Sequence, residues 1–454
     1  MRNIDKWRYF LKDIVSPDSY IDWGWYFAIS AALQRRVWAG DIHLPIFPNL
    51  YVVLVGDAAV GKSLVVDRVE SVLKHWNADF KHDDKKIEDD NIDVEEAAKG
   101  FKEMSDYEIQ TFLKDKQVRS TGKRRALFPI ASNAITYEAL VRAIASNVQK
   151  YQFQIKSGGK FVEGAYMHCS TGFVLSELGS LFRKHTEDVV TFLQQTYDCG
   201  DYEYETKTQG KDEIKKCCVG ILAGTTPSFM QRVFTDELLT EGIASRTIFV
   251  FETRNRFTKA IYKPMTQAQK EARSEVLDHL KQLATLYGHV KMEPGLEEYI
   301  EAWWKDEYNG VTRVNKATKL DHYYGRKNLH AVKLAMAMHF SESTDMLLTK
   351  ADFDNALSLL ARTEVNMHNA LMLDNKNPIN TVMKKIVSYI KRYGPQTMKD
   401  IVVEFYPICE GGMASLNEAI ESALQIGKLR KEKIDSEYKL VITEVQESPE
   451  ELES

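Results

Sequence analysis

The sequence predicts an α/β protein with a parallel-sheet core, and three observations support this fold class. Short continuous apolar runs at 51–55, 173–175, 218–223 and 248–251 are typical of strands buried on both faces of a parallel sheet. Apolar residues at helical spacing lie between these runs. The 454-residue chain is long enough for such a core and for two or three smaller domains.

The N-terminal part, residues 1–45, is predicted to be helical. Trp7, Phe10 and Ile14 occur at helical spacing, and a second set from Trp23 to Leu33 follows after a Ser-Pro-Asp break. Two packed helices are the simplest explanation of this pattern.

Residues 46–260 form the predicted α/β core. Residues 77–125 are dense in charged side chains and are predicted to be a solvated insertion within it. Between the apolar runs we expect a helix capped by Thr136, a hairpin turn at 158–159 and a helix over 185–197. An alternating strand at 202–206 and a polar turn at 209–210 follow.

The C-terminal half is predicted to be mainly helical. Residues 261–375 have amphipathic helical patterns and form a predicted α-helical lid domain. In residues 376–445, three short amphipathic helices precede two strand-like runs, an order that suggests a winged-helix domain. Residues 446–454 form an acidic tail, which is predicted to be disordered.

Composition narrows the class of protein. With 44% apolar and 28% charged residues and no long apolar stretch, the chain is not expected to cross a membrane. Five cysteines without framework spacing, and no apolar signal core, predict a reduced protein of the cytoplasm. The adjacent Cys217 and Cys218 are expected to pack as small apolar residues, so no zinc site is indicated. The net charge of −5 argues against a uniformly basic nucleic-acid coat, although a channel can confine its basic residues to one lining surface.

The segment 56–63 matches the complete P-loop pattern between a strand-like and a helix-like run. Backbone N–H groups at a helix start bind phosphate oxygens, a Lys contacts the β- and γ-phosphates, and a Ser hydroxyl binds Mg²⁺. ATP and Mg²⁺ are therefore the predicted cofactors. The predicted nucleotide contacts are Gly56, Asp57, Ala58, Ala59, Val60, Gly61, Lys62, Ser63 and Leu64.

An acidic group must also position the metal and the attacking water. Glu177, at the end of the 173–175 run, is the candidate general base, and a plain strand-end carboxylate is the alternative. Ser176 stands before it and adds a hydroxyl without charge. Ser63, Ser176 and Glu177 are thus the predicted metal-site residues.

Three further residues are candidates for catalysis. Thr225 and Thr226 end the 218–223 strand, where a hydroxyl could sense the γ-phosphate or the attacking water, although turn chemistry before Pro227 explains them too. Arg246 precedes the last core strand and is a candidate arginine finger, with a locally paired surface arginine as the alternative.

The order of these elements resembles an AAA+ ATPase of the pre-sensor-1 hairpin group, similar to minichromosome-maintenance helicases and phage replicative helicase domains. The resemblance covers roughly residues 45–345. The segment 56–63 matches Walker A, 175–177 Walker B and 202–214 the hairpin, while Thr225 or Thr226 matches sensor 1. Segment 243–246 resembles the trans-finger stretch, and segment 325–329 resembles the stretch carrying the sensor-2 arginine, here Arg326. Two departures are Ser176 in place of the Walker B Asp and a Thr where sensor 1 is often Asn.

The resemblance implies a homo-oligomeric ring, most simply a hexamer, that hydrolyses ATP at its subunit interfaces. The hairpin would then enter the pore and contact the backbone of single-stranded DNA. By itself the same polar cluster is typical of a solvated turn. The residues implied to bind nucleic acid are Lys207, Thr208, Gln209, Lys211 and Lys215.

The expected function is therefore an ATP-driven DNA helicase or translocase of phage-type DNA replication, acting in the cytoplasm of a bacterial host. A helicase loader or recombination switch that does not unwind DNA is the alternative, and a protein remodeller is a third reading. Glu410, Glu418 and Glu421 make the winged helix a poor surface for DNA. We expect it, or the acidic tail, to dock a replication partner.

Overall fold

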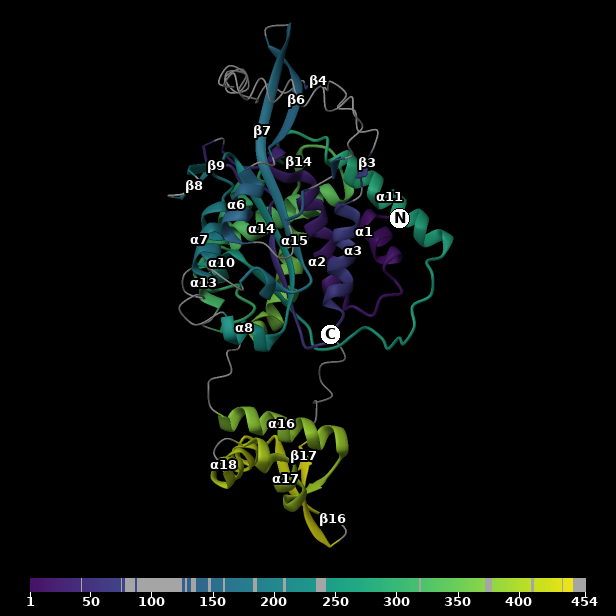
Figure 1. Ribbon diagram of the computed structural model, residues 1–454, viewed down its shortest axis with the longest axis vertical. Coiled ribbons are helices and arrows are strands. Elements are labelled where there is room, and N and C mark those ends of the chain that lie inside the picture. The colour runs from purple at the N-terminus through teal and green to yellow at the C-terminus, as the bar shows by residue number, and fades with distance from the viewer. Residues whose placement is uncertain are drawn as a thin grey trace. The chain divides into compact units, whose positions relative to one another are not determined.

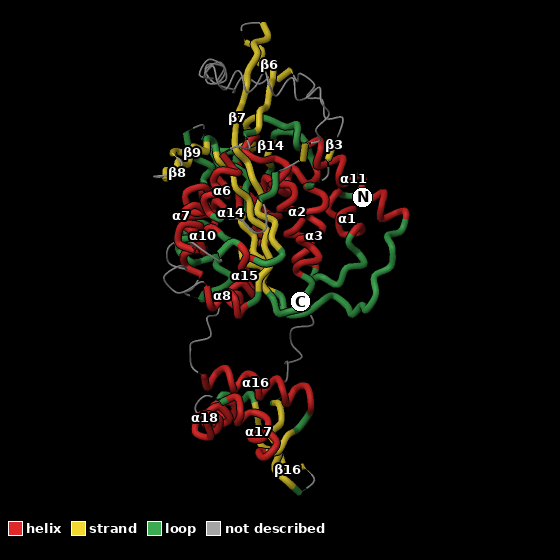
Figure 2. The backbone as a smooth tube through the Cα atoms, in the orientation of Figure 1, coloured by secondary structure: helices red, strands yellow, loops and turns green. Residues whose placement is uncertain are grey.

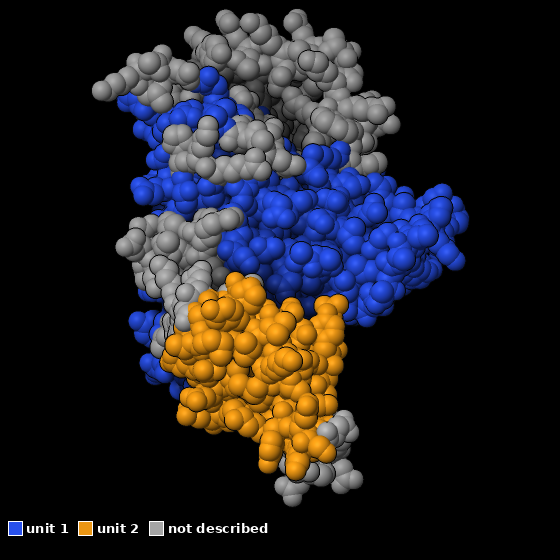
Figure 3. Space-filling view, turned by 60° about the horizontal axis from the view of Figure 1, so that its bottom comes forward, with its two compact units in different colours: residues 1–371 blue, residues 372–454 orange. Residues whose placement is uncertain are grey.

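The computed structural model divides the chain into two compact units, residues 1–371 and residues 372–454 (Figure 3). The predicted N-terminal segment, α/β core and lid all belong to the first unit. The structure describes residues 1–41, 43–74, 76–77, 86–87, 125–126, 129–131, 136–145, 148–157, 160–182, 186–206, 210–233, 242–317, 320–371, 378–409, 412–434 and 436–443.

A six-stranded sheet forms the centre of the first unit (Figures 1 and 2), in the order β11-β2-β10-β7-β6-β4. Strands β11, β2, β10 and the end of β7 run parallel to one another. Every residue of β2 and β10 is buried, as the continuous apolar runs predict. The predicted α/β fold with a parallel sheet is therefore confirmed. The strands are β2 (Tyr51–Val55), β4 (Lys86–Ile87), β6 (Gln149–Ser157), β7 (Lys160–Leu175), β10 (Cys217–Thr225) and β11 (Ile248–Phe251).

Strand β7 is much longer than the apolar run that predicts it. Its first half pairs antiparallel with β6, and its second half pairs parallel with β10. The sequence predicts a turn at 158–159, which lies outside the described residues, but not the long hairpin on either side of it. A single parallel bridge joins Ile130 to Gly172 of β7.

Helices cover both faces of the sheet. Tyr51 donates a hydrogen bond from its hydroxyl to Leu193 O of α7 (3.0 Å), whereas a Cβ at Gly220 would lie 3.2 Å from Phe27 of α2. Because Tyr51 is level with Ile221 and successive residues of a strand face opposite ways, α7 and α2 lie on opposite faces. The helices of this unit include α1 (Asn3–Phe10), α2 (Asp18–Leu33), α3 (Lys62–Leu73), α6 (Tyr137–Ala145), α7 (Thr186–Thr196), α8 (Pro227–Val233), α10 (Ile243–Arg246), α11 (Gln267–Leu283), α12 (Leu296–Tyr308), α13 (Asp321–Tyr324), α14 (Lys327–Glu342) and α15 (Lys350–Ala370).

The two N-terminal helices are part of the core of this unit. Trp7, Trp23 and Trp25 are fully buried. The indole N–H of Trp23 donates to Thr363 Oγ1 of α15 (3.0 Å), and that of Trp25 donates to Ser341 Oγ of α14 (2.7 Å). Helices predicted to form a separate segment therefore join the sheet to the C-terminal helices of the unit.

Short strand pairs complete the first unit. A two-stranded antiparallel hairpin, β8 with β9, lies between α7 and β10 as the sequence predicts. The predicted charged insertion contributes only short strands to the described residues. These pairs are β1 (Val37–Trp38) with β12 (Gly288–His289), β3 (Trp76–Asn77) with β5 (Arg125–Ala126), β8 (Tyr202–Thr206) with β9 (Gly210–Ile214), and β13 (Lys291–Met292) with β14 (Leu347–Leu348).

The second unit has its own apolar core, formed in part by Ile386, Ile401, Leu416 and Leu440. Strands β16 and β17 pair antiparallel, as the predicted two-stranded wing requires, and β15 adds a third strand that the sequence does not predict. The acidic tail lies outside the described residues. The elements are α16 (Pro378–Tyr393), β15 (Gln396–Thr397), α17 (Met398–Phe405), α18 (Gly412–Gln425), β16 (Leu429–Ile434) and β17 (Glu437–Ile442).

All five cysteines are buried and free of disulfide bonds. Cys217 and Cys218 lie on β10 inside the sheet, as small apolar residues would. Burial raises the pKa of the Cys217 thiol well above its usual value, so this thiol stays protonated.

Candidate functional site

In the 56–63 segment, residues 56–61 form a loop that joins the carboxyl end of β2 to α3, which begins at Lys62. Gly61 precedes the helix with φ +71°, a left-handed conformation that favours glycine, and Ala59 shares it with φ +69°. Lys62 begins the helix, and its Nζ donates to Gly56 O and Asp57 O, both at 2.7 Å. The loop therefore encircles the ammonium group of Lys62.

Burial and two nearby carboxylates determine the pKa of Lys62. Its side chain is only 7% exposed. Burial lowers the pKa of Lys62, while the negative charges of Glu177 and Asp57 oppose that shift. Glu177 thus lies close enough to Lys62 for its negative charge to influence the pKa of Lys62. The structure therefore brings these two predicted site residues together.

The loop is held in place by residues that sequence reasoning does not assign to the site. Ser16 Oγ donates to Gly61 O (2.7 Å), and the side-chain amide of Asn255 donates to Ala59 O (3.0 Å). A Cβ at Gly56 would lie 2.6 Å from Glu252 O, so only glycine fits there. The loop is therefore packed between the α1–α2 connection and the chain after β11. From the sequence, the Ser-Pro-Asp segment that contains Ser16 is recognisable only as a break between two helices, and nothing in it indicates a contact with the loop.

Ser176 and Glu177 follow β7 at the same edge of the sheet as the loop. Ser176 Oγ donates to Asp67 Oδ1 of α3 (3.0 Å). A Cβ at Gly224 would lie 2.7 Å from Ser176 O and 3.4 Å from Lys62 Cβ. The ends of β7 and β10 and the start of α3 therefore meet closely here, and Glu177 is exposed beside them.

The two threonines at the end of β10 differ in their surroundings. Thr225 is fully buried, and its hydroxyl makes no hydrogen bond within the part of the chain that the structure describes. Thr226 Oγ1 accepts a hydrogen bond from Phe229 N (3.3 Å) at the start of α8. The contact of Thr226 is the turn chemistry that the sequence indicates as the alternative to sensing the γ-phosphate. Thr225 remains the candidate for the sensing role.

Arg246 lies at the opposite edge of the sheet from Lys62. It ends α10, directly before β11, whose first residue Ile248 is level with Val52 near the start of β2. The strands between the two edges are four to five residues long, or roughly 15 Å. Arg246 cannot reach the loop of its own chain across that distance.

Arg326 lies close to Arg246. Burial lowers the pKa of Arg246, and the positive charge of Arg326 lowers it further. Arg246 Nη1 donates to Gly242 O (2.9 Å), and its guanidinium lies over the ring of Tyr197 with 5.8 Å to the centroid. The two predicted catalytic arginines are thus brought together, and both are separated from Lys62.

The hairpin β8–β9 rests against α6. Tyr137 and Tyr202 share a hydrogen bond between their hydroxyl groups, and the rings of Tyr137 and Tyr204 lie 5.2 Å apart. Lys207, Thr208 and Gln209, at the predicted tip, lie outside the described residues. Lys211 lies on β9 opposite Glu205, and Lys215 forms a 3.7 Å ion pair with Glu213 at the hairpin base.

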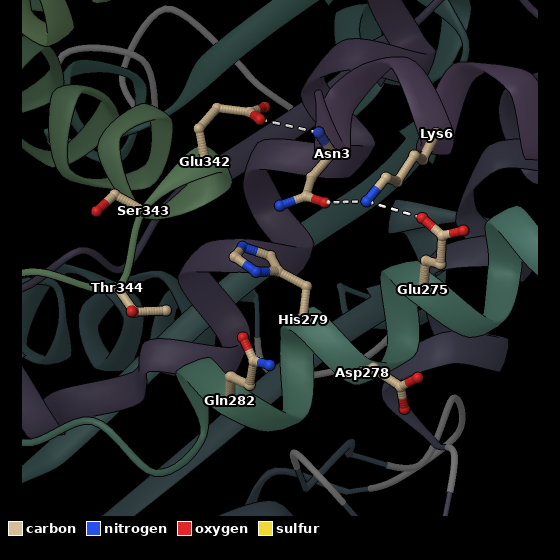
Figure 4. A pocket seen from close by; sticks show the side chains of 9 residues that line it. All are labelled: Asn3, Lys6, Glu275, Asp278, His279, Gln282, Glu342, Ser343 and Thr344. Atoms are coloured by element: carbon tan, nitrogen blue, oxygen red, sulfur yellow. Dashed lines mark hydrogen bonds and ion pairs between the residues drawn. The ribbon is translucent and has the colours of Figure 1, made fainter. Parts of the chain in front are cut away.

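A separate polar hollow lies where α1, α11 and α14 meet, and its groups pair with one another (Figure 4). The carboxylate of Glu342 accepts hydrogen bonds from Asn3 N (2.8 Å) and Ile4 N (3.2 Å) at the start of α1. Lys6 forms a 2.8 Å ion pair with Glu275. These contacts anchor α1 by satisfying its free N–H groups, and none of the predicted site residues lines this hollow.

Comparison with models of known protein families and with curated proteins gave no match. Among the described residues, no helix is long and apolar enough to cross a membrane. The same residues contain no group of three or more His, Cys, Asp or Glu side chains that could hold a metal ion. The three residues predicted to form the metal site, Ser63, Ser176 and Glu177, contribute two hydroxyl groups and one carboxylate.

Proposed function

We propose that this protein is an AAA+ ATPase that assembles into a ring and moves along single-stranded DNA. One observation carries the proposal: Lys62 and Glu177 lie at one edge of the sheet, and Arg246 and Arg326 lie together at the other. Two halves of one hydrolytic site at opposite edges can meet only between neighbouring copies. Head-to-tail association of this kind closes into a ring when the rotation permits.

Each residue at the loop has a role in ATP hydrolysis under this proposal. Lys62 exchanges its two loop carbonyls for β- and γ-phosphate oxygens, and the N–H groups at the start of α3 bind the same phosphates. Glu177 accepts a proton from the attacking water, and Thr225 stands beside the γ-phosphate. Ser63, with Ser176 and Glu177, would hold Mg²⁺, which would supply positive charge to the phosphate oxygens.

Arg246 and Arg326 of the neighbouring copy stabilise the negative charge of the transition state. An arginine finger contributes roughly 10³ to 10⁵ in rate. The surroundings of Arg246 suit that task, because its partial burial and the nearby positive charge of Arg326 outweigh the opposing charge of Asp198. An anionic phosphate from the next copy would add the negative charge that favours the guanidinium.

Exposed apolar side chains near both edges support head-to-tail packing. One set lies near the arginine pair. Lys327, the residue after Arg326, contacts Glu307 and Glu364, which are the chain neighbours of two members of this set. The other set follows Asn255, whose side chain contacts the 56–63 loop. Apolar groups exposed in this way are typical of association surfaces. The first set is Tyr308, Val311, Val314 and Val365, and the second is Phe257, Ile261, Tyr262 and Met265.

The remaining elements take the roles that the resemblance implies. The β8–β9 hairpin contacts the DNA backbone through Lys211 and the tip residues, and Lys215 contributes less because Glu213 already pairs with it. The second unit, with helices α16, α17 and α18 and its antiparallel strands, acts as a winged-helix module that docks a partner protein.

A mixing experiment tests the shared site. Arg246→Ala protein, which lacks the arginine half of the site, is mixed with Lys62→Ala protein, which lacks the phosphate-loop lysine, and ATP hydrolysis is followed. Each variant alone should be inactive, but in mixed assemblies an intact Lys62 of one copy can meet an intact Arg246 of its neighbour, so mixing should restore part of the activity. Arg2→Ala, at an exposed arginine of the first unit, is the matched control and should leave activity unchanged. No recovery of activity in mixed assemblies would refute the shared site.

A second experiment separates the helicase from a loader or switch. The helicase should displace a strand from a forked duplex only when ATP is hydrolysed. A loader should hydrolyse ATP without displacing the strand, and a protein remodeller should show no stimulation by DNA. Lys207→Ala combined with Lys211→Ala should lower DNA-stimulated ATP hydrolysis and flatten its salt dependence. Unchanged stimulation would refute the pore assignment of the hairpin.

A further inference from the structure

The position directly before Glu177 carries a hydroxyl where a carboxylate would be expected to face the magnesium site. Ser176 can orient a metal-bound water but adds no negative charge. Its Oγ donates a hydrogen bond to Asp67 Oδ1 at 3.0 Å, across 109 positions of sequence. A carboxylate therefore does lie at this point, although it comes from α3 and not from β7.

The position of Asp67 on α3 places it beside the proposed metal ligand. Asp67 follows Ser63 by four residues, so both lie on the same face of the helix, one turn apart. Both side chains are exposed on that face, whereas Val65, Val66 and Val69 are buried. The exposed face of α3 thus carries Ser63 and Asp67 one turn apart, and Asp67 contacts Ser176.

Within the described part of the chain, Asp67 has no paired cation. The helix dipole favours an acidic residue in the first turn of a helix, but Asp67 lies beyond the first turn of α3. Among the described residues, the hydrogen bond from Ser176 is the side-chain contact of the Asp67 carboxylate. A second observation concerns Thr225, which is fully buried and whose hydroxyl bonds to no described group. It follows Gly224, where a Cβ would lie 2.7 Å from Ser176 O and 3.4 Å from Lys62 Cβ.

We propose that Asp67 provides the carboxylate of the magnesium site, acting through Ser176. This inference rests on the proposed ATPase function and identifies the positioning residues of its metal. Because the Ser176 hydroxyl donates its proton to Asp67, its lone pairs face outward and accept hydrogen bonds from waters on the cation. Asp67 contributes the negative charge, and Ser176 and Ser63 contribute oxygen atoms at the start of the helix.

The test measures nucleotide binding and not turnover. A fluorescent, non-hydrolysable ATP analogue is titrated into the full-length protein in MgCl₂ and, separately, in EDTA. In the wild type, Mg²⁺ should strengthen binding of the analogue. Asp67→Asn should reduce that strengthening by about 10-fold to 100-fold, the usual effect of losing an outer-shell partner of a metal, and should leave binding in EDTA unchanged.

Two further variants make the outcome decisive. Glu70→Gln removes another carboxylate of α3, one that pairs with Lys74, and should behave as wild type. Adding Ser176→Asp to the Asp67→Asn protein returns a carboxylate to the same place and should restore the effect of Mg²⁺. Far-ultraviolet circular dichroism of each variant checks that α3 still folds.

The possible results separate this inference from the function on which it rests. If the wild type binds no analogue with or without Mg²⁺, the ATPase proposal fails, and the assignment of Asp67 fails with it. If the wild type responds to Mg²⁺ and Asp67→Asn responds equally, the assignment of Asp67 alone is wrong. If Asp67→Asn loses the response and Ser176→Asp does not restore it, the loss reflects α3 itself, and the assignment is also wrong.

Discussion

Replacing Lys327 with Met should destabilise the first unit, because Lys327 is the cation of a buried ionic network. Its Nζ donates to Glu307 Oε1 (3.0 Å) and to Glu364 Oε2 (2.9 Å). The residue exposures are 3% for Lys327, 1% for Glu307 and 0% for Glu364. Tyr323 also donates to Glu364 Oε1 (3.0 Å). Two carboxylates therefore share one ammonium group away from water.

The magnitude follows from what the substitution leaves behind. Removing one partner of a buried ion pair costs about 3–5 kcal/mol, because the remaining charge has neither water nor a counter-ion. Here two carboxylates lose their cation, so we expect the upper part of that range at pH 8. Met has a volume close to that of the Lys side chain, so a cavity contributes little.

The cost should also depend on pH, and the sign follows from Glu364. Burial raises the pKa of Glu364, and Lys327 opposes that rise. A raised pKa means that the folded state binds the proton more tightly, so stability is lost as pH increases above the unfolded value of about 4.5. Without Lys327 the pKa rises further. The variant should therefore lose less stability at pH 5 than at pH 8.

Urea unfolding followed by circular dichroism at both pH values measures this difference. Lys281→Met is the control, since Lys281 forms an exposed pair with Asp278 and should cost less than about 1 kcal/mol. Adding Glu364→Gln to Lys327→Met should recover part of the loss, since it removes one of the stranded charges. A loss below about 1 kcal/mol, or an equal loss at pH 5 and pH 8, would refute this account of the network.

Three further predictions test other parts of the chain. Gly61→Ala should weaken binding of the ATP analogue by at least about 10-fold, because its φ is +71° and a Cβ would lie 2.8 Å from Ser16 Oγ; Gly427→Ala, at the same φ in open space, is the control. Burial lowers the pKa of His339, but hydrogen bonds to Asp352 and to Asp345 O raise it overall. His339→Gln should therefore cost about 1–2 kcal/mol at pH 5.5 and less at pH 8.5 in urea unfolding, and an equal cost would contradict the pairing. Residues 1–371 alone should bind the analogue as tightly as the full chain, because they form a compact unit; weaker binding in the same titration would show that residues 372–454 contribute.

Local patterns in the sequence predict most of the secondary structure of the first unit. The buried runs that become β2, β10 and β11 are continuous and apolar because both faces of the sheet are covered. The 56–63 loop is equally local, since the glycine spacing, the Lys and the following helix are all neighbours along the chain. The sequence does not predict the length of β7, because its first half pairs only with β6 and carries no continuous apolar run.

The sequence by itself therefore determined the buried strands β2, β10 and β11, the main helices and the phosphate-loop pattern around Lys62, each of which depends on residues a few positions apart. Only the tertiary structure decided which distant side chains meet. It brought Asp67 to Ser176, Ser16 to Gly61 and Arg326 to Arg246, and it placed Lys62 and Arg246 at opposite edges of the sheet. The physical reason is that such contacts depend on how strands and helices pack, and packing combines segments that local periodicity cannot relate.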